Sequence, residues 1–103
     1  MIFKHMDRIV FAGDSVTDME SAQPVGEGLF ENVGKSYVRI VENMLAAFYP
    51  EVYLRVTNSG IGGNTGRDLL QRFDRVVVSL NPDWVSFCIC INDVWRQFDC
   101  LVI

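Results

Sequence analysis

Three mostly apolar segments of the chain have the patterns of β-strands. Residues 8–13 read Arg-Ile-Val-Phe-Ala-Gly, a short apolar run that predicts a buried strand. Residues 51–58 alternate between apolar and polar side chains, which predicts a strand with one face partly open to solvent, near a sheet edge. Residues 84–90 are apolar almost throughout and predict a third strand, of the kind that lies at the centre of a parallel sheet.

The segments between these strands predict helices and one long loop. Residues 37–48 are expected to form a helix that ends at Pro50, with an apolar face of Tyr37, Ile40, Val41, Met44, Leu45 and Phe48. A second helix is expected to end at Asn81-Pro82, with an apolar face of Leu69, Leu70, Phe73, Val76, Val77 and Leu80. Thr65 and Asp68 resemble a capping box at its start. Residues 14–34 show no period and predict a loop, and residues 92–93 are expected to open a third helix.

The order of these elements predicts the fold class. Strands that alternate with helices imply an α/β fold in which parallel strands are joined by right-handed crossovers. The 103 residues fit one domain, 1–103. Three strands would leave one edge strand bare and one face of the sheet poorly covered, so we expect a truncated α/β domain.

Composition and charge narrow the function classes. The net charge of −4 and the scattered Lys and Arg residues argue against a nucleic-acid partner and a polybasic membrane patch. No apolar run approaches the roughly 18 residues of a membrane span, and the first residues do not form a signal peptide, which favours a cytoplasmic protein.

The three cysteines, Cys88, Cys90 and Cys100, are expected to be free thiols in a reduced core, because no Cys-x-x-Cys spacing for zinc is present. The oligomeric state cannot be read from the sequence.

Polar and glycine-rich turns follow each of the three predicted strands. They span residues 13–18, 58–65 and 90–93, here called the first, second and third turns. Because ligands of open α/β sheets bind beyond the carboxyl ends of parallel strands, the three turns are expected to meet at one rim. Ser15 could act there as a nucleophile, Gly62 and Gly63 could bring a backbone N–H close to an oxyanion, and Asn92 could offer a side-chain donor. Taken singly, these residues also fit a capping serine, a plain turn and a helix N-cap.

Taken together, the three turns resemble conserved blocks of the SGNH (GDSL-type) hydrolases, a family of esterases and lipases. Gly13-Asp14-Ser15, within Gly-Asp-Ser-Val-Thr-Asp, resembles block I. Residues 58–65, Asn-Ser-Gly-Ile-Gly-Gly-Asn-Thr, resemble block II. Residues 90–93, Cys-Ile-Asn-Asp, are similar to block III, usually Gly-x-Asn-Asp. The segments 67–70, 82–85 and 91–96 are similar to bacterial lysophospholipase-like and acetylesterase-like members, and the resemblance covers roughly residues 8–99.

The resemblance implies a fold, a reaction and a set of site residues. The implied fold is a flavodoxin-like three-layer α/β/α sandwich with a parallel sheet, here reduced to its first three strands. Ser15 would be the nucleophile of a serine ester hydrolase, and its own N–H, the N–H of Gly63 and the side chain of Asn92 would bind the oxyanion. Asp14 and Asp93 would support the site. The substrate would be a small ester such as an acetylated sugar or a lysophospholipid, and no metal or organic cofactor would be needed.

Two departures from the family pattern affect these expectations. Cys90 stands where block III usually has glycine, so a positive φ there would cost of the order of 1 kcal/mol. Block V, the Asp-x-x-His that supplies the base, is missing from the 103 residues. His5 precedes the first strand and is expected some 15 Å or more from Ser15, at ~3.3 Å per strand residue. The chain by itself is therefore expected to be a poor or inactive catalyst.

Other interpretations of the same segments fit the residues less well. Gly34-Lys35-Ser36 resembles the end of a P-loop, but Leu29 stands where that motif needs glycine. Gly60-Ile-Gly62 lacks the third glycine of a dinucleotide fingerprint, because position 65 is Thr65. A receiver-like domain would need an acidic pair near Asp14 and a lysine on a later strand, and the sequence shows neither. The main alternative is a non-catalytic module that uses the same rim to hold an acyl or carboxylate ligand.

Overall fold

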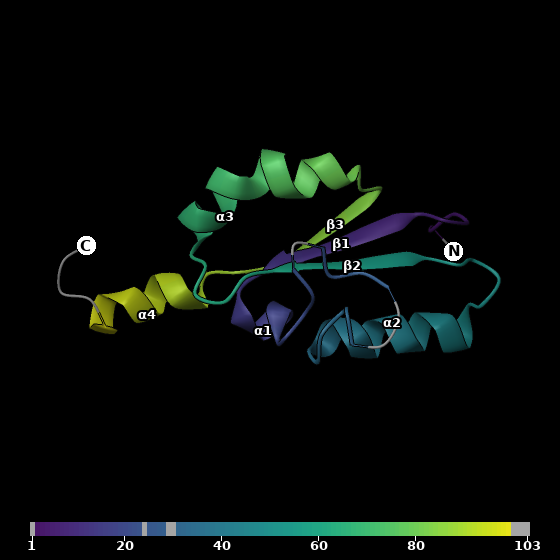
Figure 1. The fold of residues 1–103 in the computed structure, drawn as a ribbon, viewed down its shortest axis with the longest axis horizontal. Coiled ribbons are helices and arrows are strands. Elements are labelled where there is room, and N and C mark those ends of the chain that lie inside the picture. The colour runs from purple at the N-terminus through teal and green to yellow at the C-terminus, as the bar shows by residue number, and fades with distance from the viewer. Residues whose placement is uncertain (1, 24, 29–30, 100–103) are drawn as a thin grey trace.

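A computed structural model describes residues 2–23, 25–28 and 31–99, and shows strands and helices alternating along the chain (Figure 1). The elements in chain order are β1 (Arg8–Gly13), α1 (Ser15–Asp18), α2 (Tyr37–Phe48), β2 (Arg55–Gly60), α3 (Gly66–Arg72), the π-helical η1 (Phe73–Val77), the 3₁₀-helical η2 (Val78–Leu80), β3 (Trp84–Cys88) and α4 (Ile91–Asp99).

The three strands form one parallel sheet in the order β2-β1-β3. The register aligns Gly13 at the end of β1 with Gly60 of β2 and with Cys88 of β3. All three strands therefore end at the same level, and the segments that follow them leave from one edge of the sheet. This arrangement confirms the predicted α/β class.

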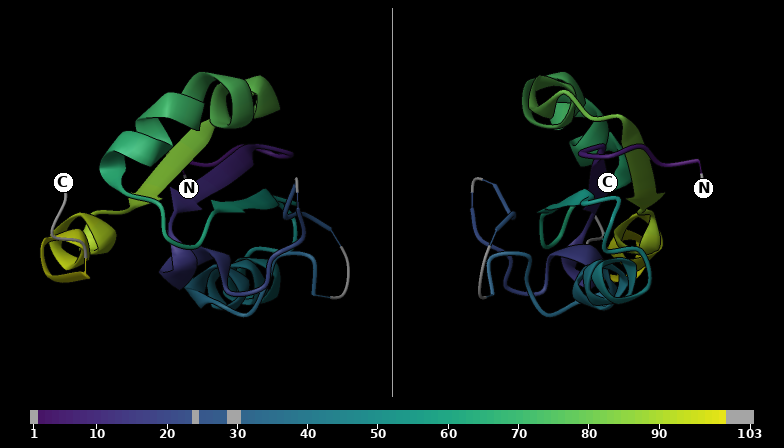
Figure 2. Two further views of the ribbon diagram at one scale, coloured as in Figure 1. Left: turned by 60° about the vertical axis from the view of Figure 1, so that its left-hand side comes forward. Right: turned by 90° about the vertical axis from the view of Figure 1, so that its right-hand side faces the viewer.

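Helices cover both faces of the sheet, which gives the predicted three layers (Figure 2). On one face, α2 packs against a core that includes Ile9, Phe11 and Val56. On the other face, the α3–η1–η2 segment packs against Val10 and Ala12. Successive residues of β1 thus point to opposite faces and supply both cores, as the pleat of a strand requires.

The position of β3 differs from the prediction. Its apolar sequence suggested a central strand, but β1 is the central strand, and β3 has only one paired neighbour among the described residues. Trp84 and Phe87 are accordingly exposed. Cys88 and Cys90 are also exposed rather than buried in a core, and Cys100 lies outside the described residues.

The observed boundaries of β1 match the predicted ones, whereas those of β2 differ. β2 begins at Arg55, later than the alternating pattern suggested, because Tyr53 has a φ of 54° and belongs to the turn after α2. β2 then continues through Gly60, into the segment expected to be a turn. The predicted loop 14–34 contains the short helix α1.

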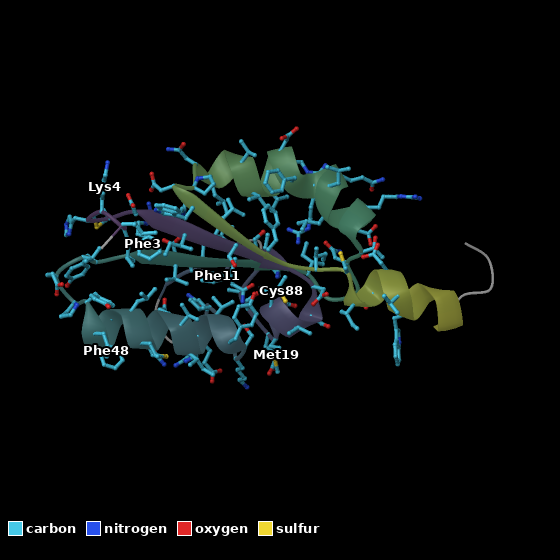
Figure 3. All side chains as sticks on the ribbon, turned by 180° about the vertical axis from the view of Figure 1, so that it is seen from behind. Phe3, Lys4, Phe11, Met19, Phe48 and Cys88 are labelled. Atoms are coloured by element: carbon cyan, nitrogen blue, oxygen red, sulfur yellow. The ribbon has the colours of Figure 1, made fainter. Side chains whose placement is uncertain are left out.

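The apolar faces of the helices are narrower than predicted. Ile40, Met44 and Phe48 of α2 are exposed, and Figure 3 shows Phe48 on the side of α2 that is turned away from the sheet. Tyr37, Val41 and Leu45, which lie on the predicted face, do pack against the core. In the second helix Leu69 and Val77 are buried, whereas Leu70 is exposed. None of the described helices has the length and apolar character needed to cross a membrane.

Candidate active site

The carboxyl ends of the strands bring the three turns to one rim. The Ile61 N–H in the second turn donates to the Gly13 carbonyl oxygen at the end of β1, at 3.0 Å. The two strand-end glycines lie in close contact with neighbouring backbone, Gly13 with β3 and Gly60 with the first turn. A Cβ at Gly13 would overlap the Cys88 carbonyl oxygen, and one at Gly60 would overlap the Asp18 backbone nitrogen. The first and second turns are therefore packed backbone to backbone.

Ser15 is exposed at the first position of α1, two residues after β1 ends. Asp14 is the N-cap of this helix, and its carboxylate accepts a hydrogen bond from the Val16 N–H at 2.9 Å. The Asp14 side chain is only 1% exposed, so it holds the turn from inside while Ser15 faces outward. The Asp14 carboxylate therefore caps α1, and its supporting role in the site stays a prediction.

The second turn lies directly against Ser15. A Cβ built on Gly62 would stand 3.8 Å from the Ser15 Cβ, in ordinary contact. The next residue, Gly63, has a φ of 81°, a left-handed conformation that glycine adopts without strain. The turn therefore places Gly62 next to the serine, and Gly63 directly follows it in the chain.

Two hydrogen bonds hold the third turn, one to the second turn and one to the start of α3. The Asn92 side-chain amide donates to the Asn64 carbonyl oxygen at 2.9 Å. The Asp93 carboxylate accepts from the Gly66 N–H at 2.9 Å, at the start of α3. Cys90 has a φ of 98°, so the position that usually holds glycine does need a left-handed backbone. Ser15 thus contacts the second turn, the second turn binds Asn92, and the start of α3 binds Asp93.

Asn58, a residue that the sequence analysis did not select, links several parts of the rim. Its buried side-chain amide donates to the Thr17 carbonyl oxygen at 2.6 Å and to the Val33 carbonyl oxygen at 2.8 Å. Its side-chain oxygen accepts from the Gly60 N–H at 2.8 Å. The first turn, the loop before α2 and the end of β2 are therefore joined through one side chain.

Arg72 is a second residue of the rim that the sequence pattern does not predict. It is the last residue of α3, only 6% exposed, and its guanidinium donates to the Asn64 side-chain oxygen at 2.7 Å. It also donates to the Ser59 hydroxyl at 3.0 Å, the Ser59 carbonyl at 2.8 Å and the Gly13 carbonyl at 3.1 Å. A weak signal was available, because position 72 borders the apolar face of its helix, three residues after Leu69 and four before Val76.

Burial shifts the pKa values of two groups beneath the rim. Burial lowers the pKa of the Arg72 guanidinium, because the charged form loses solvation. Burial also raises the pKa of Tyr37, although a hydrogen bond between its hydroxyl and the Thr17 hydroxyl, at 3.0 Å, acts in the opposite direction. Both groups contact the residues of the rim through hydrogen bonds.

His5 lies at the far end of the sheet from Ser15. Its Nδ1 is 3.4 Å from the Glu51 carbonyl oxygen, and the next residue, Met6, donates from its backbone to the Val52 carbonyl. These contacts place His5 near the turn between α2 and β2, at the amino-terminal ends of the strands. The prediction that His5 is not the base for Ser15 agrees with this position.

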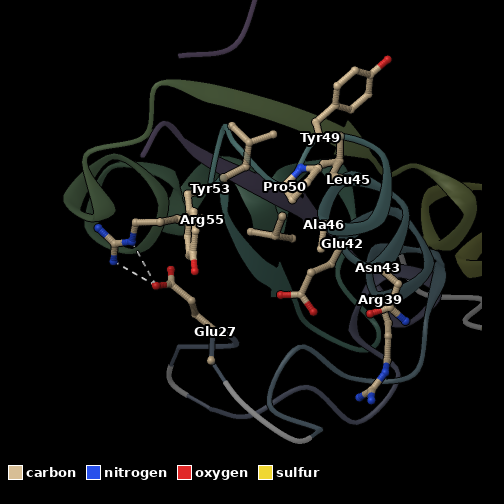
Figure 4. A pocket seen from close by; sticks show the side chains of 13 residues that line it. Glu27, Arg39, Glu42, Asn43, Leu45, Ala46, Tyr49, Pro50, Tyr53 and Arg55 are labelled. Carbon is tan, nitrogen blue, oxygen red and sulfur yellow. Dashed lines mark hydrogen bonds and ion pairs between the residues drawn. The ribbon is translucent and has the colours of Figure 1, made fainter. Parts of the chain in front are cut away.

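A cavity of about 700 Å³ lies away from the rim, between α2 and the start of β2 (Figure 4). Its walls include Glu42, Tyr49 and Tyr53, and at its edge Glu27 pairs with Arg55. Neither Ser15 nor Asn92 lines it. The candidate active site is therefore an open rim in this chain rather than part of this cavity.

A comparison with protein families finds a match that includes the three turns. The model of the GDSL-like lipase/acylhydrolase family matches residues 11–101. The chain belongs to this family. The matched GDSL-like residues include all three turns and every strand end described above.

Two relatives of this GDSL-like chain have solved structures. An acetylxylan esterase from Geobacillus stearothermophilus is 52% identical over 93 residues, which are 90% of this chain and 42% of that enzyme. Its crystal structure matches with a TM-score of 0.94 and 48% identity, over 100% of this chain and 47% of that one. An alpha/beta hydrolase from the metagenome of Lake Arreo, Spain, matches with a TM-score of 0.91 and 44% identity, over 98% of this chain and 47% of its own. This chain spans less than half the length of these relatives.

Three structures of the Geobacillus enzyme are described as catalytic mutants. One replaces a serine that carries the number 15 in that enzyme. The other two replace an aspartate and a histidine, both at positions numbered well above 103.

Proposed function

We propose that this chain carries the nucleophile and oxyanion donors of a serine ester hydrolase. Ser15 attacks the carbonyl carbon of a carboxylic ester, and the N–H groups of Ser15 and Gly63 and the side chain of Asn92 bind the oxyanion. The observation that carries this proposal is the meeting of the turns: Gly62 packs on Ser15, and the Asn92 amide binds the Asn64 carbonyl. The catalytic serine, aspartate and histidine of the Geobacillus enzyme support the same reaction class.

The reaction proceeds in two balanced steps. The Ser15 hydroxyl adds to the ester carbonyl while its proton passes to a histidine base, and the tetrahedral intermediate then expels the alcohol with that proton. Water next attacks the acyl-enzyme, passes a proton to the same base, and releases the acid and the free serine. Each oxyanion donor stabilises the transition state by ~2.7–4 kcal/mol. The base comes from outside these 103 residues, since His5 lies at the other end of the sheet.

An acetyl ester of a sugar is the substrate that the relatives support best. The Geobacillus relative is named an acetylxylan esterase, and also an acetyl-xylooligosaccharide esterase. We therefore place an acetylated xylo-oligosaccharide ahead of a lysophospholipid as the substrate class. A cytoplasmic location stays a prediction of the sequence.

A chimera tests the proposed function. Residues 1–103 replace the matching amino-terminal part of the Geobacillus acetylxylan esterase, which supplies the remaining length and its catalytic histidine. The chimera should hydrolyse p-nitrophenyl acetate and acetylated xylo-oligosaccharides. Ser15→Ala should lower kcat by about 10⁴–10⁶-fold. The matched control is Ser79→Ala, an exposed serine of η2, which should leave kcat unchanged.

Two results would overturn the proposal. A Ser15→Ala chimera that keeps its activity would remove Ser15 from the reaction. A folded chimera that neither hydrolyses the esters nor labels at Ser15 with a fluorophosphonate would favour the non-catalytic binding module. The 103-residue chain without the added part is expected to show little turnover in the same assay.

A further inference from the structure

Arg72 stands out because it is a buried cation bound to neutral oxygen atoms at the rim. Its four hydrogen bonds within the described residues go to the side-chain oxygens of Asn64 and Ser59 and to the carbonyls of Ser59 and Gly13. Burial is the cause of its lowered pKa, with no carboxylate contributing. Burying a cation among dipoles alone is unfavourable for folding, so stability by itself gives a weak reason for an arginine here.

The partners of Arg72 connect two strand ends to the second turn. Gly13 lies two residues before Ser15, Ser59 lies in the last part of β2, and Asn64 directly follows Gly63. A planar guanidinium donates in a fixed fork, so these partners are held at set angles to one another. Lysine, with a single ammonium group, could not hold all of them in the same geometry.

Asn64 passes this constraint on to the third turn. Its side chain accepts from the Arg72 Nε at 2.7 Å, and its carbonyl oxygen accepts from the Asn92 amide at 2.9 Å. An amide has two N–H donors, and this bond fixes the plane in which the second one points. A change in the position of Asn64 would therefore turn the Asn92 amide.

The backbone at Arg72 is also unusual. Arg72 has φ −99° and ψ −3°, between the helical and extended regions, and the chain continues as the π-helical turn η1. Single π-helical turns are rare and are often found at functional sites. The irregular helix therefore lies where the guanidinium turns back beneath the rim.

We propose that Arg72 is a positioning residue for ester hydrolysis, which holds Asn64 and, through the Asn64 carbonyl, the Asn92 amide in the orientation that binds the oxyanion. This inference rests on the proposed function for its catalytic consequence. Its structural part, the dependence of the Asn92 amide on Arg72, can be measured without any catalysis.

The first experiment uses the 103-residue chain and solution NMR. Arg72→Lys keeps the charge and removes the fork, and Asn64→Ala removes the accepting side chain while leaving the other Arg72 partners in place. Both should shift the Asn92 side-chain NH₂ resonances and speed their hydrogen exchange, while the core amides of β1 stay protected. Arg75→Lys, at an exposed arginine of η1, is the matched control and should change neither. Unchanged Asn92 resonances in both test variants would overturn the inference.

The second experiment uses the chimera with the Geobacillus enzyme. Arg72→Lys and Asn64→Ala should each lower kcat for p-nitrophenyl acetate by roughly 10–100-fold with little change in KM, as expected when reacting groups are misplaced by about 1 Å. A change in KM alone, or kcat values equal to that of Arg75→Lys, would contradict positioning. A parent chimera with no activity would defeat the proposed function instead, and the NMR result would still decide whether Arg72 orients Asn92.

Discussion

At the scale of single residues, Cys90 combines a left-handed backbone with a β-carbon. Its φ of 98° lies in a region that L-residues avoid, because Cβ crowds the neighbouring carbonyl oxygen. The third turn nevertheless keeps this conformation, since hydrogen bonds join Asn92 to the second turn and Asp93 to the start of α3. The turn therefore contains local strain that a glycine would not have.

Replacing Cys90 by glycine should remove this strain. We expect Cys90→Gly to raise the free energy of unfolding by about 1 kcal/mol, the usual difference for a non-glycine residue at positive φ. Urea unfolding followed by circular dichroism would measure the change. Cys90→Ala is the control, because it removes the thiol and keeps Cβ, and it should bring no such gain. Equal stability of the glycine and alanine variants would show that the backbone at residue 90 is not strained.

The hydrogen bonds around Glu27 change the pKa of its carboxyl and should affect the stability of the fold. Its carboxylate accepts hydrogen bonds from Arg8 at 2.8 and 3.1 Å, from Arg55 at 2.9 and 3.2 Å, and from the Thr57 hydroxyl. Partial burial acts to raise its pKa, but the bonds from Thr57, Arg8 and Arg55 outweigh this effect and hold the pKa below its ordinary value of 4.5. The ionised form therefore stabilises the fold by fastening the loop before α2 to the sheet.

The stability of the chain should fall in acid for this reason. A carboxyl whose pKa is depressed in the folded state contributes fully above its unfolded value and loses that contribution as pH falls through the folded value. We expect the free energy of unfolding to decrease below about pH 4.5, and Glu27→Gln to flatten that decrease. At pH 7 the variant should be less stable by about 1–2 kcal/mol, allowing for solvent screening of a partly exposed group.

The control for this pH dependence is Glu51→Gln, at an exposed glutamate in the turn after α2. It should leave both the stability at pH 7 and the slope in acid unchanged. Urea titrations at a series of pH values would provide both measurements. An acid slope of Glu27→Gln that equals the slope of the unaltered chain would assign the loss of stability to other carboxylates.

At the scale of elements, the sequence pattern predicts whether a segment is a helix or a strand better than it predicts where that element begins and ends. The Thr65–Asp68 capping box forms as expected, because it depends on contacts within four residues. The residue at which β2 begins and the exposure of part of the predicted apolar face of α2 depend on tertiary contacts. The periodicity of the sequence does not contain that information. Periodicity likewise does not predict the π-helical turn η1, which directly follows Arg72.

At the scale of the whole molecule, the rim could be predicted because strand order determines it. Once three strands are parallel, the turns after Gly13, Gly60 and Cys88 must share an edge, and the register confirms that they do. The supporting residues Asn58, Asn64 and Arg72 could not be predicted in the same way. Their roles depend on hydrogen bonds between segments that lie far apart in the sequence.

The outer edge of β3 pairs with no other strand among the described residues. β3 pairs with β1 on one side only, so its other side presents unpaired backbone groups. Phe87 of this strand is 55% exposed and stacks on Phe73 at 5.6 Å between ring centroids. An open edge with an exposed aromatic side chain is a template for pairing with another strand.

We expect the 103-residue chain to associate reversibly through this edge. Sedimentation velocity over a range of concentrations should show a shift from monomer to larger species. Phe87→Lys places a charge on the edge strand and should weaken the association by about tenfold or more, equivalent to ~1.4 kcal/mol. Phe48→Lys replaces a phenylalanine that is 70% exposed on α2, away from any strand edge, and should leave association unchanged. Because the two substitutions add the same charge, equal effects would point to general repulsion between molecules, and a chain that stays monomeric at every concentration would show that the β3 edge does not pair.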